Sequence, residues 1–273
     1  MIQLYDYRFI WSWDGANSAE ENMARDREML GALREPFLQT PQIRFYSWNS
    51  PSITVGYSQR PKEWVHLIRA HELGIEVVQR PTGGGVVFHQ RDFTWSIAAT
   101  QEALGFTSIQ ECYQKIHQAV AVGLKKQFGL PVYLASCENV GAPSFCFAVP
   151  VGYDIMALNR KLVGGAIRWT KKGVLYQGTL PLTRDFSLFK DVVLPSKRSW
   201  LEALDVSPLP PMGGEERVNG NGKWQYQNLI EALLDGFHSE LGWEISARGS
   251  PASDGMEDSS NEMRHVWAGN RRG

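Results

Sequence analysis

The sequence predicts an α/β fold of the α+β type, in which a mixed, largely antiparallel sheet is flanked by helices. Short β-rich runs follow one another along the chain, and in the central third residues 158–161 have the character of a hairpin turn. Two Ser-x-x-Glu capping boxes, Ser18 with Glu21 and Ser108 with Glu111, each open a segment with apolar residues at helical spacing. No internal repeat interrupts this mixture of elements.

Four helices are expected from these signals. The first follows Ser18 and packs its apolar stripe against the sheet. Pro61 suits the first turn of a second helix, and Gly74 suits its end. A third helix runs from Ser108 to about residue 128, and a fourth covers about 224–241 with one apolar side.

Strands are expected wherever β-rich runs are bounded by turn-forming residues. The runs 43–47 and 52–56 lie on either side of Pro51, and we expect them to be neighbouring antiparallel strands. The other strands are expected at 75–79, 86–88, 93–99, 132–134, 145–148, 153–157, 161–169 and 174–180.

The domain organisation follows from length and from two changes in composition. A chain of 273 residues is long enough for either one large α/β domain or one domain with a small appendage. Residues 208–214 are rich in Pro and Gly and indicate a loop or linker. Residues 246–261 are rich in Ser, Gly, Asp and Glu and indicate disorder. We therefore expect one catalytic domain over 1–245 and a flexible tail over 246–273.

Composition and charge exclude several classes of function. Hydrophobic residues make up 43% of the chain, which is enough to fill a sizeable core. Lys and Arg number 28 against 29 Asp and Glu, which argues against a broad nucleic-acid surface. No apolar run reaches 18 residues and no signal core follows the N-terminus. We expect a cytoplasmic protein with neither nucleic acid nor a membrane as partner.

Common metal and hydrolase signatures are absent from the sequence. The three cysteines, Cys112, Cys137 and Cys146, are odd in number and lack C-x-x-C spacing, so each is interpreted as a free thiol. The six histidines show no metal-ligand spacing, and no G-x-S-x-G elbow marks a nucleophilic serine. No metal site is expected.

The segment 80–89, RPTGGGVVFH, is the most informative motif. Gly83, Gly84 and Gly85 have no Cβ, so their backbone can adopt positive φ and let another group lie against it. A glycine-rich surface turn leading into a strand is the simpler interpretation. The motif is neither a dinucleotide fingerprint nor a phosphate loop, because no helix beginning with Lys-Ser/Thr follows it.

The order of several segments resembles the biotin/lipoate protein ligase and acyltransferase family, in particular its lipoate-protein ligase A-like members and most closely the cysteine-dependent octanoyltransferases. The segments lie at 22–30, 52–59, 80–89, 145–155 and 160–182. The resemblance implies a class II biotin/lipoyl synthetase-like catalytic domain whose sheet holds an acyl chain and delivers it to a lysine of a small carrier domain. One branch of the family activates the acyl group with ATP. Another holds it as a thioester on an enzyme cysteine.

Cys146 distinguishes the two branches. On its own, a cysteine inside the apolar run Ser-Phe-Cys-Phe-Ala is interpreted as an inert core thiol. Pro150, Tyr153 and Asp154 follow it, and Lys161 stands 161 − 146 = 15 positions later, which is similar to the octanoyltransferases in residue type and spacing. The resemblance therefore implies that Cys146 is the catalytic nucleophile, provided that a nearby cation or donor favours its thiolate.

Lys161 is the second catalytic candidate, although a lysine at a hairpin edge is usually solvated. In the family motif its ammonium orients the acyl carbonyl and stabilises the developing oxyanion. Gly164, Gly165 and Ala166 follow it, and such small residues let a ligand approach the strand.

The remaining candidates lie in and beside the glycine motif. Arg80 and Thr82 are interpreted as supports of the glycine loop. Arg80 can also meet a phosphate, or form a surface salt bridge. His89 is an alternative proton acceptor, although a histidine at a strand end is as often structural. Gln79 stands where a second arginine is frequent in the family, and no C-terminal accessory domain of the ATP-dependent ligases is recognised. Both departures favour transfer over ligation.

The sequence thus predicts an acyltransferase that moves an octanoyl or lipoyl group through Cys146 onto a carrier lysine. The donor is octanoyl-acyl carrier protein or a modified carrier domain, and the acceptor is a lipoyl-carrier protein such as the glycine cleavage H protein or a dehydrogenase E2 subunit. This reaction requires no cofactor. One alternative is an ATP-dependent lipoate ligase, which would use ATP and Mg. Another is a non-catalytic protein that binds the acyl group or the carrier domain.

Overall fold

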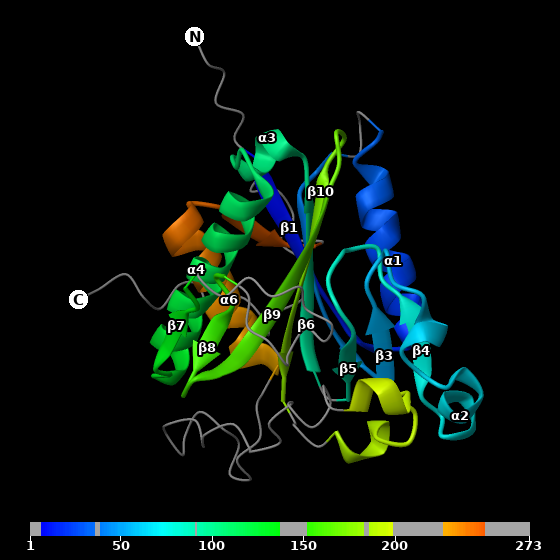
Figure 1. Cartoon of the computed structure of the whole chain (residues 1–273). Helices are drawn as coiled ribbons and strands as arrows, with labels where there is room; N and C mark the ends of the chain where they lie inside the picture. Colours follow the sequence, from blue (N-terminus) through cyan, green and yellow to red (C-terminus); the bar gives the residue numbers. More distant parts are fainter. Residues whose placement is uncertain are drawn as a thin grey trace, which may run out of the picture.

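The computed structural model describes residues 7–35, 39–90, 92–136, 152–182, 186–198 and 226–248. These residues form layers (Figure 1). Helices α4 (Ile109–Phe128) and α6 (Tyr226–Leu241) cover one face of a large sheet, while α1 (Ala19–Ala32) and a second, smaller sheet lie on the other. The predicted fold class, a mixed and largely antiparallel sheet flanked by helices, is confirmed.

Within the described residues the large sheet has eight strands, in the order β11-β1-β2-β6-β10-β9-β8-β7. Strand β1 is parallel to both of its neighbours, and the other pairs are antiparallel. Leu158 and Asn159 join β8 to β9 with φ of 48° and 61°, as a two-residue hairpin turn requires, so the turn predicted there is confirmed. The strands are β1 (Arg8–Asn17), β2 (Gln42–Trp48), β6 (Asp92–Ala99), β7 (Val132–Leu134), β8 (Ile155–Ala157), β9 (Arg160–Trp169), β10 (Val174–Pro181) and β11 (Glu244–Ala247).

The smaller sheet has the order β4 (Glu76–Gln79), β3 (Ser52–Val55), β5 (Val87–His89). Strand β3 is parallel to β4 and antiparallel to β5. The prediction that 43–47 and 52–56 are neighbouring antiparallel strands is wrong, because β2 pairs with β1 and β6 in the large sheet while β3 belongs to the small one. Residues 49–51 carry the chain from one sheet to the other.

The two capping boxes open helices as predicted. Ser18 Oγ accepts a hydrogen bond from the Glu21 N–H before α1, and Ser108 Oγ accepts one from the Glu111 N–H before α4. These bonds satisfy backbone donors that have no partner within a helix. Helix α6 also lies where a helix was predicted, and a short helix α3 (Gln101–Leu104) precedes α4.

The helix predicted over 61–74 is divided in two. A 3-10 turn at Pro61–Glu63 is followed by α2 (Leu67–Glu72). Between them Val65 forms a β-bridge with Val193, and the His66 N–H donates to the Val192 carbonyl. This tertiary pairing takes the backbone groups that would have continued the helix. Further 3-10 turns lie at Ser187–Phe189 and Pro195–Lys197.

Strands β1 and β11 were not predicted, and they lie side by side at one edge of the large sheet. Ser246 and Ala247, which the composition had assigned to the flexible tail, are the last two residues of β11. The stacking of Phe9 on Trp243, with ring centroids 4.1 Å apart, helps to hold this edge. The strand predicted at 145–148, the linker at 208–214 and residues 249–273 lie outside the described residues.

The main core lies between the large sheet and the pair α4 and α6, and a second core lies under the small sheet. The two helices cross closely: a Cβ on Gly123 would overlap the Ala232 carbonyl oxygen, and one on Gly236 would overlap that of Ala119.

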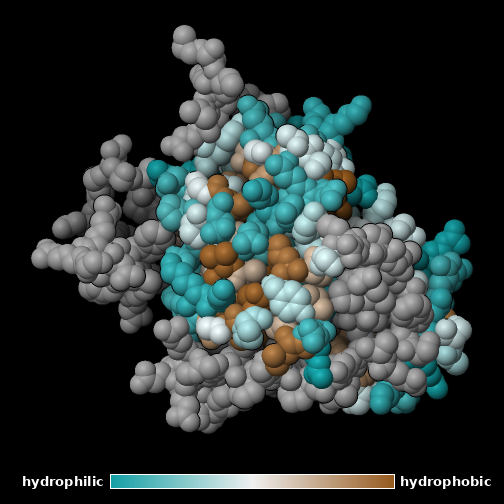
Figure 2. All heavy atoms as spheres, turned by 60° about the vertical axis from the view of Figure 1, so that its left-hand side comes forward, coloured by the Kyte–Doolittle hydropathy of each residue, from teal (hydrophilic) through white to brown (hydrophobic). Residues whose placement is uncertain are grey.

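On the face with α4 and β7, hydrophilic side chains dominate and hydrophobic ones gather near the centre (Figure 2). None of the helices in the described ranges is long and apolar enough to span a membrane.

Candidate active site

A pocket lies between the large sheet and the small one, bordered by α1. Its empty space, which is open to solvent, is about 410 Å³, and the surface that its walls expose is mostly apolar. Strands β2, β3, β5, β6, β9 and β10 all contribute to its walls. Among the residues that line it are five candidates from the sequence: Arg80, His89, Gly164, Gly165 and Ala166.

The glycine loop, residues 82–85, is packed against the rest of the small sheet. Gly84 has a φ of 88°, a conformation that favours glycine. A Cβ on Gly56 would overlap the Gly84 carbonyl oxygen, so the two backbone segments touch. Thr82 is fully buried and donates through Oγ1 to the side-chain oxygen of Gln177 on β10. The loop is therefore held in place at its buried ends while Gly84 is exposed, and none of residues 82–85 is among the described residues that line the pocket.

Arg80 fixes the glycine loop from inside. Its guanidinium donates from Nη2 and Nε to the Gly83 carbonyl oxygen, at 2.6 and 3.1 Å, and lies 3.3 Å from Thr54 Oγ1. Only 5% of Arg80 is exposed. The alternative of a surface salt bridge is therefore wrong, because the guanidinium is buried and turned toward the protein's own carbonyl oxygens.

His89 belongs to a chain of buried hydrogen bonds in the pocket wall. Its Nδ1 lies 2.8 Å from Asp92 Oδ2, its Nε2 lies 3.0 Å from Thr54 Oγ1, and its ring stacks on Trp48 at 3.8 Å. Burial lowers the pKa of His89, and the opposing charge of Asp92 does not reverse this. A neutral ring whose Nδ1–H donates to Asp92 and whose Nε2 accepts from Thr54 fits these contacts. Both ring nitrogens are thus already in use.

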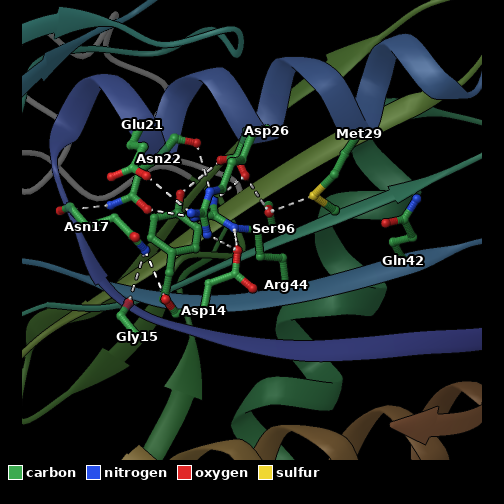
Figure 3. A network of polar contacts seen from close by, with 12 residues as sticks. Asp14, Gly15, Asn17, Glu21, Asn22, Asp26, Met29, Gln42, Arg44 and Ser96 are labelled. Atoms are coloured by element: carbon green, nitrogen blue, oxygen red, sulfur yellow. Dashed lines mark hydrogen bonds and ion pairs between the residues drawn. The ribbon is translucent and has the colours of Figure 1, made fainter. Parts of the chain in front are cut away.

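A buried ionic network, which the sequence did not predict, supports the same wall (Figure 3). Arg44 on β2 reaches α1, where its Nη1 lies 2.9 Å from Asp26 Oδ1 and its Nη2 donates to Asn22 Oδ1 at 2.6 Å. Asp26 also accepts from the Tyr46 hydroxyl and from the Gln177 side-chain amide. Tyr46 and Gln177 both line the pocket. The network therefore connects α1 to the pocket wall.

One sequence signal could have revealed this network. Asn22 and Asp26 stand four residues apart, on the same side of a helix as Met23 and Met29, and all four are buried. A carboxylate and an amide on the buried side of a helix require polar partners from elsewhere in the fold. The partner, Arg44, lies in a strand 18 residues after Asp26, and the sequence around it does not indicate this pairing.

Lys161 is buried, with 6% of the residue exposed, although a lysine beside a hairpin turn is usually solvated. Its Nζ lies 2.7 Å from Asp154 Oδ2, and Asp154 is fully buried. The Tyr113 hydroxyl, from α4, donates to the other oxygen of this carboxylate at 2.6 Å. Lys161 is not among the described residues that line the pocket, and it lies in the same strand as those that are.

Packing against α4 also requires glycine at position 165. A Cβ there would lie 2.7 Å from both His117 Nε2 and the Tyr176 hydroxyl, so the space belongs to a helix α4 side chain and its partner. Gly164 and Ala166 pair across β9 and β10 with Thr179 and Gln177, which are pocket-lining residues. The small residues of this segment therefore leave space for the pocket on one face of the sheet and for side chains of α4 on the other.

Two of the three cysteines, Cys137 and Cys146, lie outside the described residues. Cys112 is a free thiol that is fully buried in the core, and burial raises its pKa to about 12. Such a thiol packs and does not react.

Comparison with known proteins identifies the family. The model of the lipoyl protein ligase A/B catalytic domain matches residues 18–210. The chain belongs to this family. Octanoyltransferase LipM of Moorella thermoacetica is 35% identical over 191 residues, covering 67% of this chain and 68% of the relative. Octanoyltransferase LipM of Bacillus subtilis is 32% identical over 206 residues, covering 72% and 73%.

Solved structures share the fold of this lipoyl protein ligase A/B member. Lipoate-protein ligase A bound with ATP superposes with a TM-score of 0.66 at 23% identity, covering 92% of this chain and 90% of that one. A bipartite lipoate protein ligase from Thermoplasma acidophilum superposes with a TM-score of 0.65 at 20% identity, covering 91% of this chain and 88% of that one.

In the part of the chain that the structure describes, no three His, Cys, Asp or Glu side chains gather as metal ligands would.

Proposed function

We propose that this protein is an octanoyltransferase of protein lipoylation, which moves an octanoyl group through a thioester on Cys146 to a lysine of a lipoyl-carrier protein. Its similarity to octanoyltransferases LipM, at 35% identity over two thirds of both chains, is the observation that carries the proposal. The apolar pocket between the sheets supports it, because an acyl chain without polar groups suits such a lining.

The reaction proceeds in two steps, each exchanging one acyl bond for another. Cys146 loses its thiol proton, and its thiolate attacks the carbonyl carbon of an octanoyl thioester. A new C–S bond forms, the C–S bond of the donor breaks, and the donor leaves as a thiol after taking up that proton. The neutral amine of the acceptor lysine then attacks the enzyme thioester, an amide forms, and the Cys146 thiol is released. The enzyme thioester has nearly the same energy as the donor thioester that it replaces, and its cleavage drives formation of the amide, so no ATP is required.

In this proposal Lys161 stabilises the negative charge that develops during transfer. Each step passes through a tetrahedral intermediate with negative charge on the former carbonyl oxygen, and a fixed positive charge in a buried site stabilises it. The Lys161 ammonium is buried and held by Asp154. Substrate contact at Arg80, Thr82, Gly83, Gly84, Gly85, His89, Gly164, Gly165 and Ala166 is part of the same proposal, in which the loop and β9 form two walls of the acyl site.

The partners follow from this chemistry. The donor carries an octanoyl thioester on a phosphopantetheine arm or an octanoyl group on a carrier domain, and we propose octanoyl-acyl carrier protein for the first. The acceptor is a lipoyl domain such as the glycine cleavage H protein or a dehydrogenase E2 subunit. We place the reaction in the cytoplasm.

Incubation of the protein with octanoyl-acyl carrier protein and a lipoyl domain, without ATP, tests the proposal. Mass spectrometry should show an octanoylated lipoyl domain and a thioester adduct on the enzyme. Cys146→Ala should lose transfer by more than about 10³-fold, as removal of a nucleophile does. Cys112→Ala, which removes a core thiol, should keep it. Transfer that needs free acid and ATP would instead identify a ligase, and tight binding without turnover a binding protein.

A further inference from the structure

Helix α4 presents two polar aromatic residues to the edge of the large sheet. Tyr113 and His117 stand four residues apart, one turn of the helix, and their rings lie with centroids 4.1 Å apart. His117 is fully buried and Tyr113 is partly buried. Both side chains contact the segment Tyr153–Asp154, immediately before β8.

The Tyr113 hydroxyl connects Asp154 to the pocket wall. It donates to Asp154 Oδ1 at 2.6 Å and accepts from the Gly165 N–H at 3.2 Å, with the Gly165 carbonyl oxygen also 3.2 Å away. Among the described residues, strand β8 pairs with β9 only as far as Val163, and at Gly165 the Tyr113 hydroxyl contacts both the backbone N–H and the carbonyl oxygen. One oxygen atom therefore fixes the distance between a pocket residue and the carboxylate that holds Lys161.

His117 holds the backbone next to that carboxylate. Its Nδ1 lies 2.7 Å from the Tyr153 carbonyl oxygen and its Nε2 lies 2.8 Å from the Tyr176 hydroxyl. Tyr153 has a φ of 69°, in the left-handed region that a residue with a side chain seldom adopts. Such a conformation persists only where surrounding contacts enforce it, and the hydrogen bond from His117 is one of them.

We propose that Tyr113 and His117 are positioning residues for the transfer reaction: together they fix Asp154, and through Asp154 they set the place of the Lys161 ammonium relative to the Gly165 wall of the pocket. The proposal rests on the proposed function, in which Lys161 stabilises the oxyanion. A cluster that only stabilises the core would instead leave the reaction unaffected wherever the protein stays folded.

Steady-state kinetics of two conservative variants test this role. Tyr113→Phe removes one hydroxyl, and His117→Phe removes both ring nitrogens while keeping an aromatic ring. Each should lower kcat about tenfold with KM for octanoyl-acyl carrier protein unchanged. Tyr113→Phe removes a bond to the Asp154 carboxylate, and His117→Phe removes the bond to the backbone carbonyl of Tyr153, next to that carboxylate. Tyr133→Phe, the matched control, removes an exposed hydroxyl that bonds Asn159 and should keep kcat.

A double-mutant cycle separates positioning from stability. If Tyr113 acts through Lys161, then Tyr113→Phe should cost less than about twofold when added to Lys161→Met, because the group that it positions is gone. Equal losses in the wild-type and Lys161→Met backgrounds would overturn the proposal. So would a kcat for Tyr113→Phe within about twofold of the wild-type value.

Lysine acetylation followed by mass spectrometry tests the positioning without any transfer assay. Lys161 should react slowly in the wild-type protein and several times faster in Tyr113→Phe, while the exposed Lys126 reacts equally in both. An unchanged Lys161 rate would overturn the proposal. Absence of octanoyl transfer by the wild-type protein would refute the proposed function instead, and the acetylation result would still decide whether Tyr113 positions Lys161.

Discussion

At the scale of single residues, His117 shows how burial of an uncharged side chain affects stability. Burial lowers the pKa of His117 to about 4, against the smaller opposing effect of the Asp154 charge. In the unfolded chain the pKa of histidine is about 6.5. Between these values the unfolded state binds more protons than the folded state, so the free energy of unfolding rises with pH there and falls as pH is lowered.

We therefore expect the free energy of unfolding to fall by about 2 kcal/mol between pH 7 and pH 5 because of His117. Urea unfolding of the wild-type protein and of His117→Gln at the two pH values measures this difference. His89 is shifted in the same direction, so the variant should keep part of the decrease and lose the share that belongs to His117. An identical decrease in both proteins would show that His117 is not held neutral.

The residues of the site differ in how far the sequence could reveal them. The glycine loop, Arg80 and His89 form one continuous motif, and Arg80 and His89 line the pocket while Arg80 bonds the loop at the Gly83 carbonyl oxygen. Asp26 and Arg44 were missed because their pairing depends on α1 lying across β2, which no local pattern encodes. Lys161 became a candidate through its resemblance to the family motif. Its ion pair with Asp154, 161 − 154 = 7 positions earlier, appears only once β8 and β9 form their hairpin.

At the scale of elements, the crossing of α4 and α6 depends on two glycines. Gly123→Ala would place a methyl group on the Ala232 carbonyl oxygen, and backbone atoms cannot move aside as a flexible side chain can. We expect a loss of about 2–3 kcal/mol in the free energy of unfolding, typical of overpacking between elements. Thermal or urea unfolding measures it.

A second glycine provides the control for this substitution. Gly31 lies in α1 with nothing within 4 Å of the position of a Cβ. Gly31→Ala should therefore stabilise the protein by up to about 1 kcal/mol through helix propensity alone. If both substitutions changed stability in the same direction, the close helix crossing would not be the cause of the loss at Gly123.

Element types were predictable where the signal is local, and pairings were not. The caps at Ser18 and Ser108 and the turn at 158–161 depend on neighbouring residues, and all three are confirmed. The runs on either side of Pro51 gave no information on which sheet each would join. Helix 61–74 was interrupted by a bridge to Val193, more than 100 residues away along the chain.

At the scale of the whole molecule, the pocket exists only because two separate sheets and α1 meet around it. Ligand binding should therefore stabilise the assembled fold as a unit. At a concentration of 100 Kd a ligand that binds only the folded state adds about 2.7 kcal/mol. For a chain of this size we expect the melting temperature to rise by about 5 °C or more.

Thermal unfolding with a non-reactive amide analogue of octanoyl-pantetheine measures this shift. The acetyl counterpart has too short a chain to fill the pocket and should produce little change. Ala166→Leu places a branched side chain in the pocket wall opposite Gln177 and should abolish the octanoyl-dependent shift. An unchanged shift in Ala166→Leu would mean that the acyl chain binds elsewhere, and an equal shift with the acetyl analogue would mean that the pantetheine arm alone is recognised.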